Sequence, residues 1–399
     1  MLKLNVIIIG AGLGGLCLAQ ALRKAEISAD IFERDDGPWE RPQGYRLHID
    51  ADGAGALASA LSSDLFELFD MTAMEPEPYT TIVDTAFDLR RRIPIDAPEP
   101  PLDPRPPIRH ANVNRATLRE ILLRGLDVHF GARLVSYRSD DNGVIAHFAD
   151  GRIVRGDLLV GADGVHSAVR RQRCPNAAIQ DTGVRAIYGR IPIGAATMIL
   201  PGHVLQNVFT VASDARKVFL GLGPVVFPVR PDAIPQRMAQ LRPQDDYVSC
   251  IIGGPRDCIN QDDAALRALD SAGLQAQATE WLSVWPDITR RLPAHGDPAS
   301  FFLVEMATSV PTRLSPAPNV TLLGDAIHAM TPTLGRGANL AMRDARRLAH
   351  QLIKVVRGEL SLTEAVAAYE ADMTAYGFDV VRKSAAAGVA LMGQRPLPE

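Results

Sequence analysis

The stretch that decides the fold is Leu4-Asn5-Val6-Ile7-Ile8-Ile9-Gly10-Ala11-Gly12-Leu13-Gly14-Gly15. Its first half is a short apolar, β-branched run, which is typical of a buried parallel strand. Its second half fits the pattern G-x-G-x-x-G. A helical pattern over residues 16–24 follows, and then a second apolar strand over residues 29–32 that ends at Glu33. This order of strand, glycine turn, helix, strand and acid predicts a dinucleotide-binding unit.

Each part of this fingerprint has a physical task. Gly10 permits the tight turn, Gly12 lets a pyrophosphate approach the backbone, and Gly15 lets the helix pack closely on the strand. The N-terminus of the following helix offers unpaired N–H groups and the positive end of its dipole to the phosphates, and Leu13 is one of the predicted cofactor-binding positions. Glu33 is placed to accept hydrogen bonds from a ribose diol. The fingerprint alone leaves FAD and NAD both open.

The bulk properties of the chain exclude several classes of protein. Its 399 residues suggest two domains, or one large domain with an inserted unit. The net charge of −4 gives no indication of nucleic acid or of an anionic membrane as partner. The four cysteines form no C-x-x-C pair, so neither a zinc site nor a dithiol motif is predicted. No apolar run reaches the roughly 18 residues of a membrane span, and a cleavable signal has no room, so we expect a cytoplasmic protein with reduced thiols.

The pattern of elements divides the chain between two domains. A proline-rich stretch over residues 74–107 is interpreted as an excursion out of the first domain. After residue 183 the sequence pattern predicts mainly strands and turns. We therefore predict an α/β fold, with a Rossmann-like cofactor-binding domain, an inserted antiparallel β-sheet substrate domain and a helical C-terminus. The predicted pieces are 1–73, 108–182 and 301–358 for the first domain, 74–107 and 183–300 for the substrate domain, and 359–399 for the helical segment.

Two further glycine-marked turns follow apolar strands, at intervals of about 150 residues. The first is Gly161-Ala162-Asp163-Gly164-Val165-His166-Ser167-Ala168-Val169-Arg170. The second is Gly324-Asp325-Ala326-Ile327-His328, which continues through Pro332 to Gly335-Arg336-Gly337-Ala338-Asn339. Because α/β folds bind ligands at the carboxyl ends of parallel strands, we expect all three turns to converge there.

With these three motifs the sequence resembles the FAD-dependent aromatic hydroxylases, the single-component flavoprotein monooxygenases of the p-hydroxybenzoate hydroxylase type. The resemblance covers nearly the whole chain, and the tetracycline-inactivating and natural-product hydroxylases of secondary metabolism look most similar. It implies bound FAD and a transient NADPH or NADH, which agrees with the absence of a second complete G-x-G-x-x-G. It further implies that O2 adds at flavin C4a, and that the resulting hydroperoxide hydroxylates or epoxidises an aromatic or polyketide-like small molecule.

The resemblance implies roles for the positions around FAD. Glu33 would hold the adenosine ribose with Arg34 beside the adenine end, and Arg115 would contact the pyrophosphate or ribityl chain. Asp325 would accept hydrogen bonds from the ribityl hydroxyls, or it is a helix cap. Asp163 serves FAD and the nicotinamide nucleotide, or it only stabilises an Asp-Gly turn. The other implied cofactor positions are Gly14, Gly324, Gly337, Ala338 and Asn339.

The reactive end of the flavin would meet the loop after His328. Pro332 would lie near flavin C4a, and Gly335 would let backbone N–H groups approach the ring, where the following helix dipole favours the anionic reduced flavin. Relatives commonly carry glutamine where this chain has Arg336, to which no role is assigned. Arg46 and His48 alternate on a strand that lies beside the isoalloxazine in relatives. They contact the flavin, the nicotinamide or the substrate, or they are partnered structural residues.

The substrate is expected between the sheet domain and the flavin, in a largely apolar pocket. Four candidate residues lie on expected strands: Tyr188, Gln206, Phe209 and Phe219. The motif histidines His166 and His328 are interpreted as turn-stabilising. The substrate's identity, the choice between NADH and NADPH and the oligomeric state are not determined by the sequence.

Three alternatives share the scaffold. A flavin-dependent halogenase is disfavoured because no lysine occurs between Lys24 and Lys217, and because the tryptophans at 281 and 285 have the wrong spacing for its motif. A flavin-linked prenyl reductase is not excluded by any motif. A flavin-binding protein without redox turnover, such as a non-redox cyclase or a ligand sink, is opposed only by the intact motifs.

Overall fold

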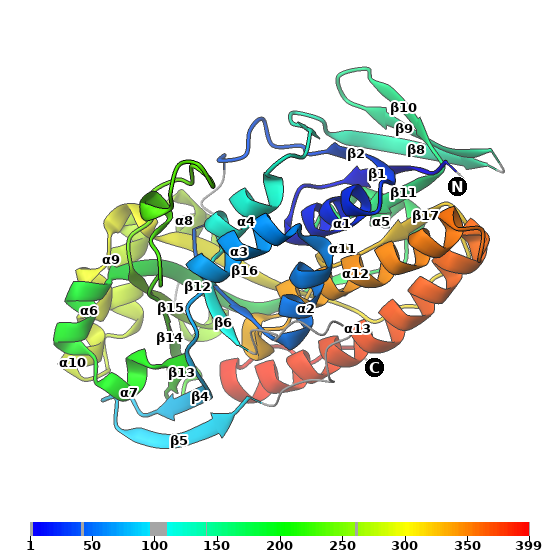
Figure 1. The fold of residues 1–399 in the computed structure, drawn as a ribbon. Helices are drawn as coiled ribbons and strands as arrows, with labels where there is room; N and C mark the ends of the chain where they lie inside the picture. Colours follow the sequence, from blue (N-terminus) through cyan, green and yellow to red (C-terminus); the bar gives the residue numbers. More distant parts are fainter. Residues whose placement is uncertain (1–2, 41–43, 96–109, 141, 260–261, 399) are drawn as a thin grey trace.

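Two large β-sheets organise the molecule (Figure 1). The computed structural model describes residues 3–40, 44–95, 110–140, 142–259 and 262–398. The first sheet has five strands, and each neighbouring pair runs parallel. Its strands, in spatial order, are β17 (Val320–Leu322), β11 (Leu158–Gly161), β1 (Asn5–Ile9), β2 (Ser28–Phe32) and β7 (Val128–His129). Residues 6–9 are all buried, as expected for a parallel strand covered on both faces.

Helices and a small sheet cover the two faces of this first sheet. On one side α12 packs against α1 and α2, and the long α13 runs beside α12 (Figure 1). On the other side lie α5 and a three-stranded antiparallel sheet whose strands contact β1 and β11. The helices of this domain are α1 (Leu13–Lys24), α2 (Ala51–Ala60), α3 (Ser63–Thr72), α4 (Arg115–Leu123), α5 (Ala168–Arg173), α11 (Asp325–His328), α12 (Gly337–Val356) and α13 (Leu362–Met392). The three-stranded sheet consists of β8 (Leu134–Asp140), β9 (Gly143–Phe148) and β10 (Ile153–Gly156).

The second large sheet has seven strands and holds the excursion predicted over residues 74–107, of which 96–107 lie outside the described residues. Its strands, in spatial order, are β16 (Phe302–Ser309), β12 (Ile179–Pro192), β15 (Tyr247–Pro255), β14 (Phe219–Val225), β13 (Asn207–Ser213), β4 (Glu77–Val83) and β5 (Leu89–Pro94). All neighbouring pairs are antiparallel except β13 with β4. The predicted antiparallel sheet is confirmed, and β13 with β4 is a parallel pair within it. More than a hundred residues separate these two strands, so no tight turn dictates their relative direction.

One domain boundary also differs from the prediction. The strand expected to return to the first domain at residue 301 is β16, which instead pairs with β12 at the edge of the second sheet. The chain re-enters the first sheet only at β17. An apolar run bounded by turn residues indicates a strand, but its sequence does not say which sheet supplies the neighbour.

The two faces of the seven-stranded sheet pack differently. One face forms a core with α8 (Asp263–Ala268) and α9 (Ser271–Trp281), together with short helical segments. Those segments are α6 (Ile193–Ile199), α7 (Gly202–Leu205), α10 (Asp287–Arg290), η3 (Leu292–His295) and η4 (Pro298–Ser300). The opposite face carries a separate group of side chains, here called the aromatic cluster: Tyr45, Tyr188, Phe209, Phe219 and Phe302. Tyr45 reaches this cluster from the first domain, so the cluster lies where the two domains meet.

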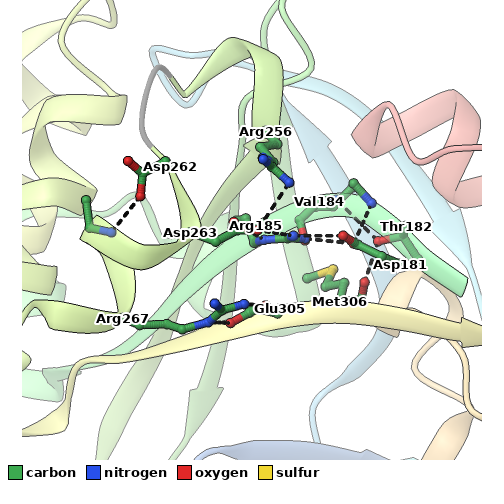
Figure 2. Close-up of polar contacts among 12 residues, drawn as sticks. Asp181, Thr182, Val184, Arg185, Arg256, Asp262, Asp263, Arg267, Glu305 and Met306 are labelled. Atoms are coloured by element: carbon green, nitrogen blue, oxygen red, sulfur yellow. Dashed lines mark hydrogen bonds and ion pairs between the residues drawn. The ribbon is translucent and has the colours of Figure 1, made fainter. Parts of the chain in front are cut away.

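An ion-pair network around the buried side chain of Arg185 fixes β12 where it is bulged (Figure 2). The Arg185 guanidinium is 1% exposed and pairs with Asp181 at 2.8 Å and with Asp263, the first residue of α8, at 2.7 Å. The hydrogen bond from Arg185 lowers the pKa of Asp181 to about 2. Because successive side chains alternate across a strand, anchoring Arg185 on the helix side directs Val184 and Tyr188 to the opposite face.

The remaining elements join these layers. A two-stranded antiparallel sheet of β3 (Arg46–Ile49) and β6 (Ala111–Asn114) lies next to β14. The other short helical turns are η1 (Pro231–Ala233), η2 (Arg256–Cys258) and η5 (Pro332–Leu334). Asn114 caps α4 as predicted, because its side chain accepts hydrogen bonds from the N–H groups of Ala116 and Thr117. None of the helices in the described ranges is both long and apolar enough to cross a membrane.

Candidate functional site

The three glycine-marked turns meet at one cleft beside the carboxyl ends of β1, β2 and β11. The cleft has a volume of about 360 Å³. Seven of the predicted cofactor residues line it: Gly10, Gly12, Glu33, Arg34, Arg115, Asp163 and Asp325. A larger cavity of about 710 Å³ lies between residues 311–318 and α13, but its lining includes none of the predicted site residues. The smaller cleft is therefore the candidate cofactor site.

The glycines of the first turn have different roles. Two of them are needed for close packing of the backbone, and the third leaves open space beside it. A Cβ at Gly10, whose φ is +108°, would lie 2.4 Å from the carbonyl oxygen of Ala162, and a Cβ at Gly15 would lie 2.2 Å from that of Gly10. Gly12 has an ordinary extended conformation, with φ −76° and ψ 177°, and a Cβ there would meet nothing within 4 Å. Protein packing does not require a glycine at 12. The space beside it fits a pyrophosphate at the N-terminus of α1, whose first turn carries no acidic residue.

Glu33 holds the glycine turn and faces the cleft at the same time. Its carboxylate accepts hydrogen bonds from the N–H of Ala11 at 2.8 Å and from the N–H of Asp35 at 3.1 Å. A carboxylate has about four acceptor positions, so both oxygens keep capacity for ribose hydroxyls. The arrangement suits the adenosine end of FAD.

Arg119 is a cleft residue that the sequence reasoning missed. It is almost fully buried, and its Nε donates to the carbonyl oxygen of Ala11 at 3.0 Å, while its Nη1 donates to that of Pro38. It therefore ties α4 to the first glycine turn. The signal was present, because Arg119 is four residues after the predicted Arg115 on the same helix face, and both line the cleft.

Asp163 and Asp325 both line the cleft but differ in their own contacts. The Asp163 carboxylate accepts hydrogen bonds from the Ser167 hydroxyl at 2.5 Å and from the Ala168 N–H at 2.6 Å, so it stabilises the turn that begins α5. The Asp325 carboxylate has no hydrogen-bond partner within the described residues. It reaches solvent through the cleft, yet the surrounding burial raises its pKa, against the opposing charges of His328 and Arg115. Asp325 thus remains available for ligand hydroxyls.

The loop from Pro332 to Asn339 is tied to the turn after β3. The side-chain amide of Asn339 donates to the carbonyl oxygens of His48 at 2.9 Å and Gly335 at 3.0 Å, and its oxygen accepts from the Asp50 N–H at 3.0 Å. These bonds occupy the side chain of Asn339, so its backbone is left for the predicted cofactor role. Gly335 has φ +64°, and a Cβ there would lie 3.7 Å from His48 Nδ1. Predicted catalytic positions from two parts of the chain are therefore neighbours.

Arg336, to which the sequence gave no role, reinforces the same connection. Its guanidinium pairs with Asp50 at 2.9 Å and with Asp52 at 2.6 Å, and it donates to the Tyr376 hydroxyl at 2.7 Å. Burial raises the pKa of Asp50 to about 6, although the charge of Arg336 opposes this rise. The glycine loop is thereby fixed to α2 by an ion pair that is mostly shielded from water.

We expect Arg336→Met to destabilise the protein by about 3 kcal/mol at pH 8, because it leaves Asp50 as an uncompensated buried charge. The pKa of Asp50 is already above its value in the unfolded chain, and loss of Arg336 raises it further. Protonation of Asp50 therefore favours the folded state as the pH falls, and the loss should be smaller at pH 5. Urea unfolding at both pH values measures this. Arg336→Met with Asp50→Asn should recover most of the stability at pH 8, and an equal loss at both pH values would contradict the assignment.

Arg46 and His48 share the face of β3 that is directed at the second sheet. Arg46 donates to Asn112 Oδ1 at 3.1 and 2.6 Å and to the carbonyl oxygen of Val208 on β13. His48 is buried and its Nε2 lies 3.0 Å from Nδ1 of His110, with the two rings stacked. Burial lowers the pKa of His48 well below its ordinary value, and the charges of Arg46, His110 and Arg336 act in the same direction. His48 is therefore neutral at physiological pH.

The structure separates the four predicted substrate residues. Tyr188, Phe209 and Phe219 lie together in the aromatic cluster, with the ring of Tyr188 centred 5.4 Å from that of Phe302. Gln206 does not join them. The strand expected over residues 205–211 begins only at Asn207, because α7 takes the preceding residues, and Gln206 is left exposed at the end of that helix. The assignment of Gln206 to a strand was wrong.

The two motif histidines occupy different places. His166 lines the cofactor cleft. His328 is fully buried, and its Nε2 pairs with Asp344 at 2.6 Å, while the same carboxylate oxygen accepts from the Gly324 N–H at 3.1 Å. The pair stabilises the turn that presents Asp325 to the cleft.

Comparison with known proteins shows which family this chain belongs to. The sequence profile of the FAD binding domain family matches residues 3–247 and 268–384. The dual O-methyltransferase/FAD-dependent monooxygenase elcB of Phaeosphaeria nodorum is 31% identical over 444 residues, which cover 99% of this chain and 47% of that protein. The FAD-dependent monooxygenase thnD of Trichoderma harzianum is 29% identical, covering 96% of this chain and 92% of that one. The chain thus spans about half the length of the dual-function relatives it matches.

Solved structures share the complete fold. A FAD-containing monooxygenase from Photorhabdus luminescens superposes with a TM-score of 0.81 and 28% identity, covering 98% of this chain and 99% of that one. HpxO of Klebsiella pneumoniae, complexed with FAD and uric acid, gives a TM-score of 0.77 over 98% of this chain and 89% of that one. At 24% identity, the second similarity shows the fold alone.

Proposed function

This chain belongs to the FAD binding domain family, and from that premise we propose that it is an FAD-dependent monooxygenase that consumes NADPH or NADH and O2 and hydroxylates or epoxidises an aromatic or polyketide-like small molecule. One observation carries the proposal. A single cleft collects three features from distant parts of the chain: the open side of Gly12, the carboxylate of Glu33, and the carboxylate of Asp325, which has no hydrogen-bond partner within the described residues. Phosphates fit the first, and hydroxyls fit the other two.

When bound, FAD supplies the redox chemistry, and the protein supplies position, electrostatics and exclusion of water. The N-terminus of α12 follows Gly335 and Arg336 and directs its positive dipole end at the loop next to His48. His48 Nε2 and His110 Nδ1 lie at hydrogen-bonding distance, 3.0 Å apart, which fixes the His48 ring next to Gly335. The aromatic cluster on the facing sheet offers flat apolar surface for a ring-bearing substrate.

The test of this proposal is direct. The purified protein should be yellow or become yellow on loading with FAD. NADPH or NADH should bleach it, and air should restore the colour. With an accepted substrate, oxygen uptake should match nucleotide oxidation, and mass spectrometry should show a product heavier by one oxygen atom. A protein that binds FAD but is neither reduced by a nicotinamide nucleotide nor reoxidised by oxygen would instead indicate a non-redox flavin-binding protein.

The same assay separates the redox alternatives on this scaffold. A prenyl reductase would reduce its substrate without incorporating oxygen. A halogenase would need halide for product formation. Oxygen incorporation without halide would exclude both.

A further inference from the structure

The loop that contains η5, residues 331–335 and here called the η5 loop, has a protein side and an open side. Thr331 is 2% exposed and Thr333 is half-buried, whereas Pro332 between them and Leu334 after them are both exposed. Hydroxyl groups therefore occupy the protein side of the loop, and apolar side chains occupy its open side. The loop leads directly into α12.

A buried group of hydroxyls and one amide, here called the polar cluster, holds the η5 loop on α13. The Ser384 hydroxyl donates to the carbonyl oxygen of Thr331 at 2.9 Å, and the Thr333 hydroxyl donates to the carbonyl oxygen of Ser384 at 2.9 Å. The Thr331 hydroxyl donates to Gln394 Oε1 at 2.9 Å. Ser384 is fully buried and Gln394 is 2% exposed, so water does not compete for these bonds.

The placement of Gln394 lowers the stability of the fold in two ways. Its Nε2 is buried without a hydrogen-bond partner within the described residues, and an unpaired buried donor is destabilising. A Cβ at Gly388, inside α13, would lie 2.2 Å from Gln394 Oε1, so only glycine fits there, and glycine weakens a helix interior. Departures of this kind from the most stable arrangement are expected where a side chain serves a functional site.

The chain after α13 connects the polar cluster to the seven-stranded sheet. The N–H of Arg395 donates to the carbonyl oxygen of Thr182 at 2.8 Å, and the side-chain amide of Gln180 donates to the carbonyl oxygen of Pro396 at 2.8 Å. Both partners lie on β12, at or next to its bulge. Gln394 is therefore fixed between β12 and the η5 loop.

We propose that Gln394 is a positioning residue of the flavin site, which acts through Thr331 and Ser384 to hold the η5 loop against bound FAD. This inference rests on the proposed function and adds a residue to it. A Cβ at Gly337, the first residue of α12, would lie 3.9 Å from Asp325 Oδ1, so the end of the loop borders the cofactor cleft. Because the loop is fixed, the N–H groups at the start of α12 are preorganised for the negative charge that FAD gains on reduction.

The experiment measures the midpoint reduction potential and the visible spectrum of the FAD-loaded protein. Gln394→Met removes the amide at similar side-chain length, Thr331→Val removes the hydroxyl at nearly unchanged shape, and Thr331→Ser keeps the hydroxyl. Thr374→Val is the matched control, because the Thr374 hydroxyl donates to the carbonyl oxygen of Glu370, one turn earlier on α13. Dithionite and reference dyes set the potential, so neither a nicotinamide nucleotide nor a substrate is needed. FAD content and circular dichroism establish that each variant is folded.

We expect the ratio of reduced to oxidised FAD at a fixed applied potential to fall about tenfold in Gln394→Met and in Thr331→Val, which is a midpoint lower by about 30 mV for a two-electron couple. Thr331→Ser and Thr374→Val should remain near the wild type. A purely structural role would lower the melting temperature without changing the potential of the folded, FAD-loaded protein.

An unchanged or higher potential in Gln394→Met would overturn the inference, and so would an equal shift in Thr374→Val. If only one of Gln394→Met and Thr331→Val folds, that variant decides. Failure of both to fold would mean that the polar cluster serves the stability of the fold, and it would also overturn the inference.

Oxygen uptake and the oxidation of NADPH or NADH, recorded on the same preparations, separate this inference from the monooxygenase proposal. Normal turnover by the wild type, with no change of potential in Gln394→Met, would leave the proposed function standing and refute the role of Gln394. A lowered potential in Gln394→Met, in a protein that no nicotinamide nucleotide reduces, would support that role and refute the proposed function.

Discussion

Replacing Gly12 by valine is expected to give a folded protein that does not retain FAD. A Cβ at this position would meet no protein atom within 4 Å, and the backbone has φ −76° and ψ 177°, where a β-branched residue is unstrained. The cost to the apoprotein should be only the poorer N-cap of α1, about 1 kcal/mol. The new side chain would instead occupy the space where the pyrophosphate approaches the backbone. We expect FAD affinity to fall by at least about 100-fold, or about 3 kcal/mol.

The matched control is Gly15→Ala, three residues further along the same turn. Its Cβ would lie 2.2 Å from the carbonyl oxygen of Gly10, so this smaller change should prevent folding and not only cofactor binding. Circular dichroism, thermal unfolding and the ratio of flavin to protein absorbance distinguish the two outcomes. A Gly12→Val protein that binds FAD normally would show that the pyrophosphate does not lie at this turn.

Asp344→Asn is expected to cause the largest loss of stability without touching the cleft. Asp344 and His328 are both fully buried, and the carboxylate also accepts from the Gly324 N–H. Burial alone would lower the pKa of His328, but the charge and hydrogen bond of Asp344 outweigh it, so the pKa is raised. Removing one partner of a buried ion pair costs about 3–5 kcal/mol, and because asparagine keeps an acceptor for the Gly324 N–H we expect about 3 kcal/mol at pH 6.

The pH dependence has a definite sign. Since the folded pKa of His328 is higher than its unfolded value, the pair stabilises the protein fully at a pH below the unfolded pKa, and this contribution is lost as the pH rises through the folded pKa. The difference between wild type and Asp344→Asn should therefore shrink from pH 6 to pH 9 in urea unfolding. Asp372→Asn, at a pair that joins α13 to Arg343 on α12 and whose carboxylate is 39% exposed, should cost less than about 1 kcal/mol. A pH-independent loss at Asp344 would mean that His328 is neutral in the folded protein.

The sequence by itself determined the local units of the cofactor domain. Residues 4–15 specify a strand, a glycine turn and a helix start through β-branched residues, glycines and a short-range pattern, none of which depends on distant partners. The cap at Asn114 is equally local. The three glycine turns were expected to converge because topology places the ends of parallel strands at one edge of a sheet.

Only the tertiary structure decided which side chains remain available at the site. Asn339 lies in a predicted cofactor-binding motif, but its side-chain amide hydrogen-bonds to the backbone of His48 and Asp50, nearly three hundred residues earlier in the chain. Arg46 donates to Asn112 and to the carbonyl oxygen of Val208, which are distant in the sequence, and nothing next to Arg46 in the sequence reveals this. A hydrogen bond or ion pair between distant segments depends on where packing brings the backbone, and the short-range patterns that specify strands and helices carry no information about it.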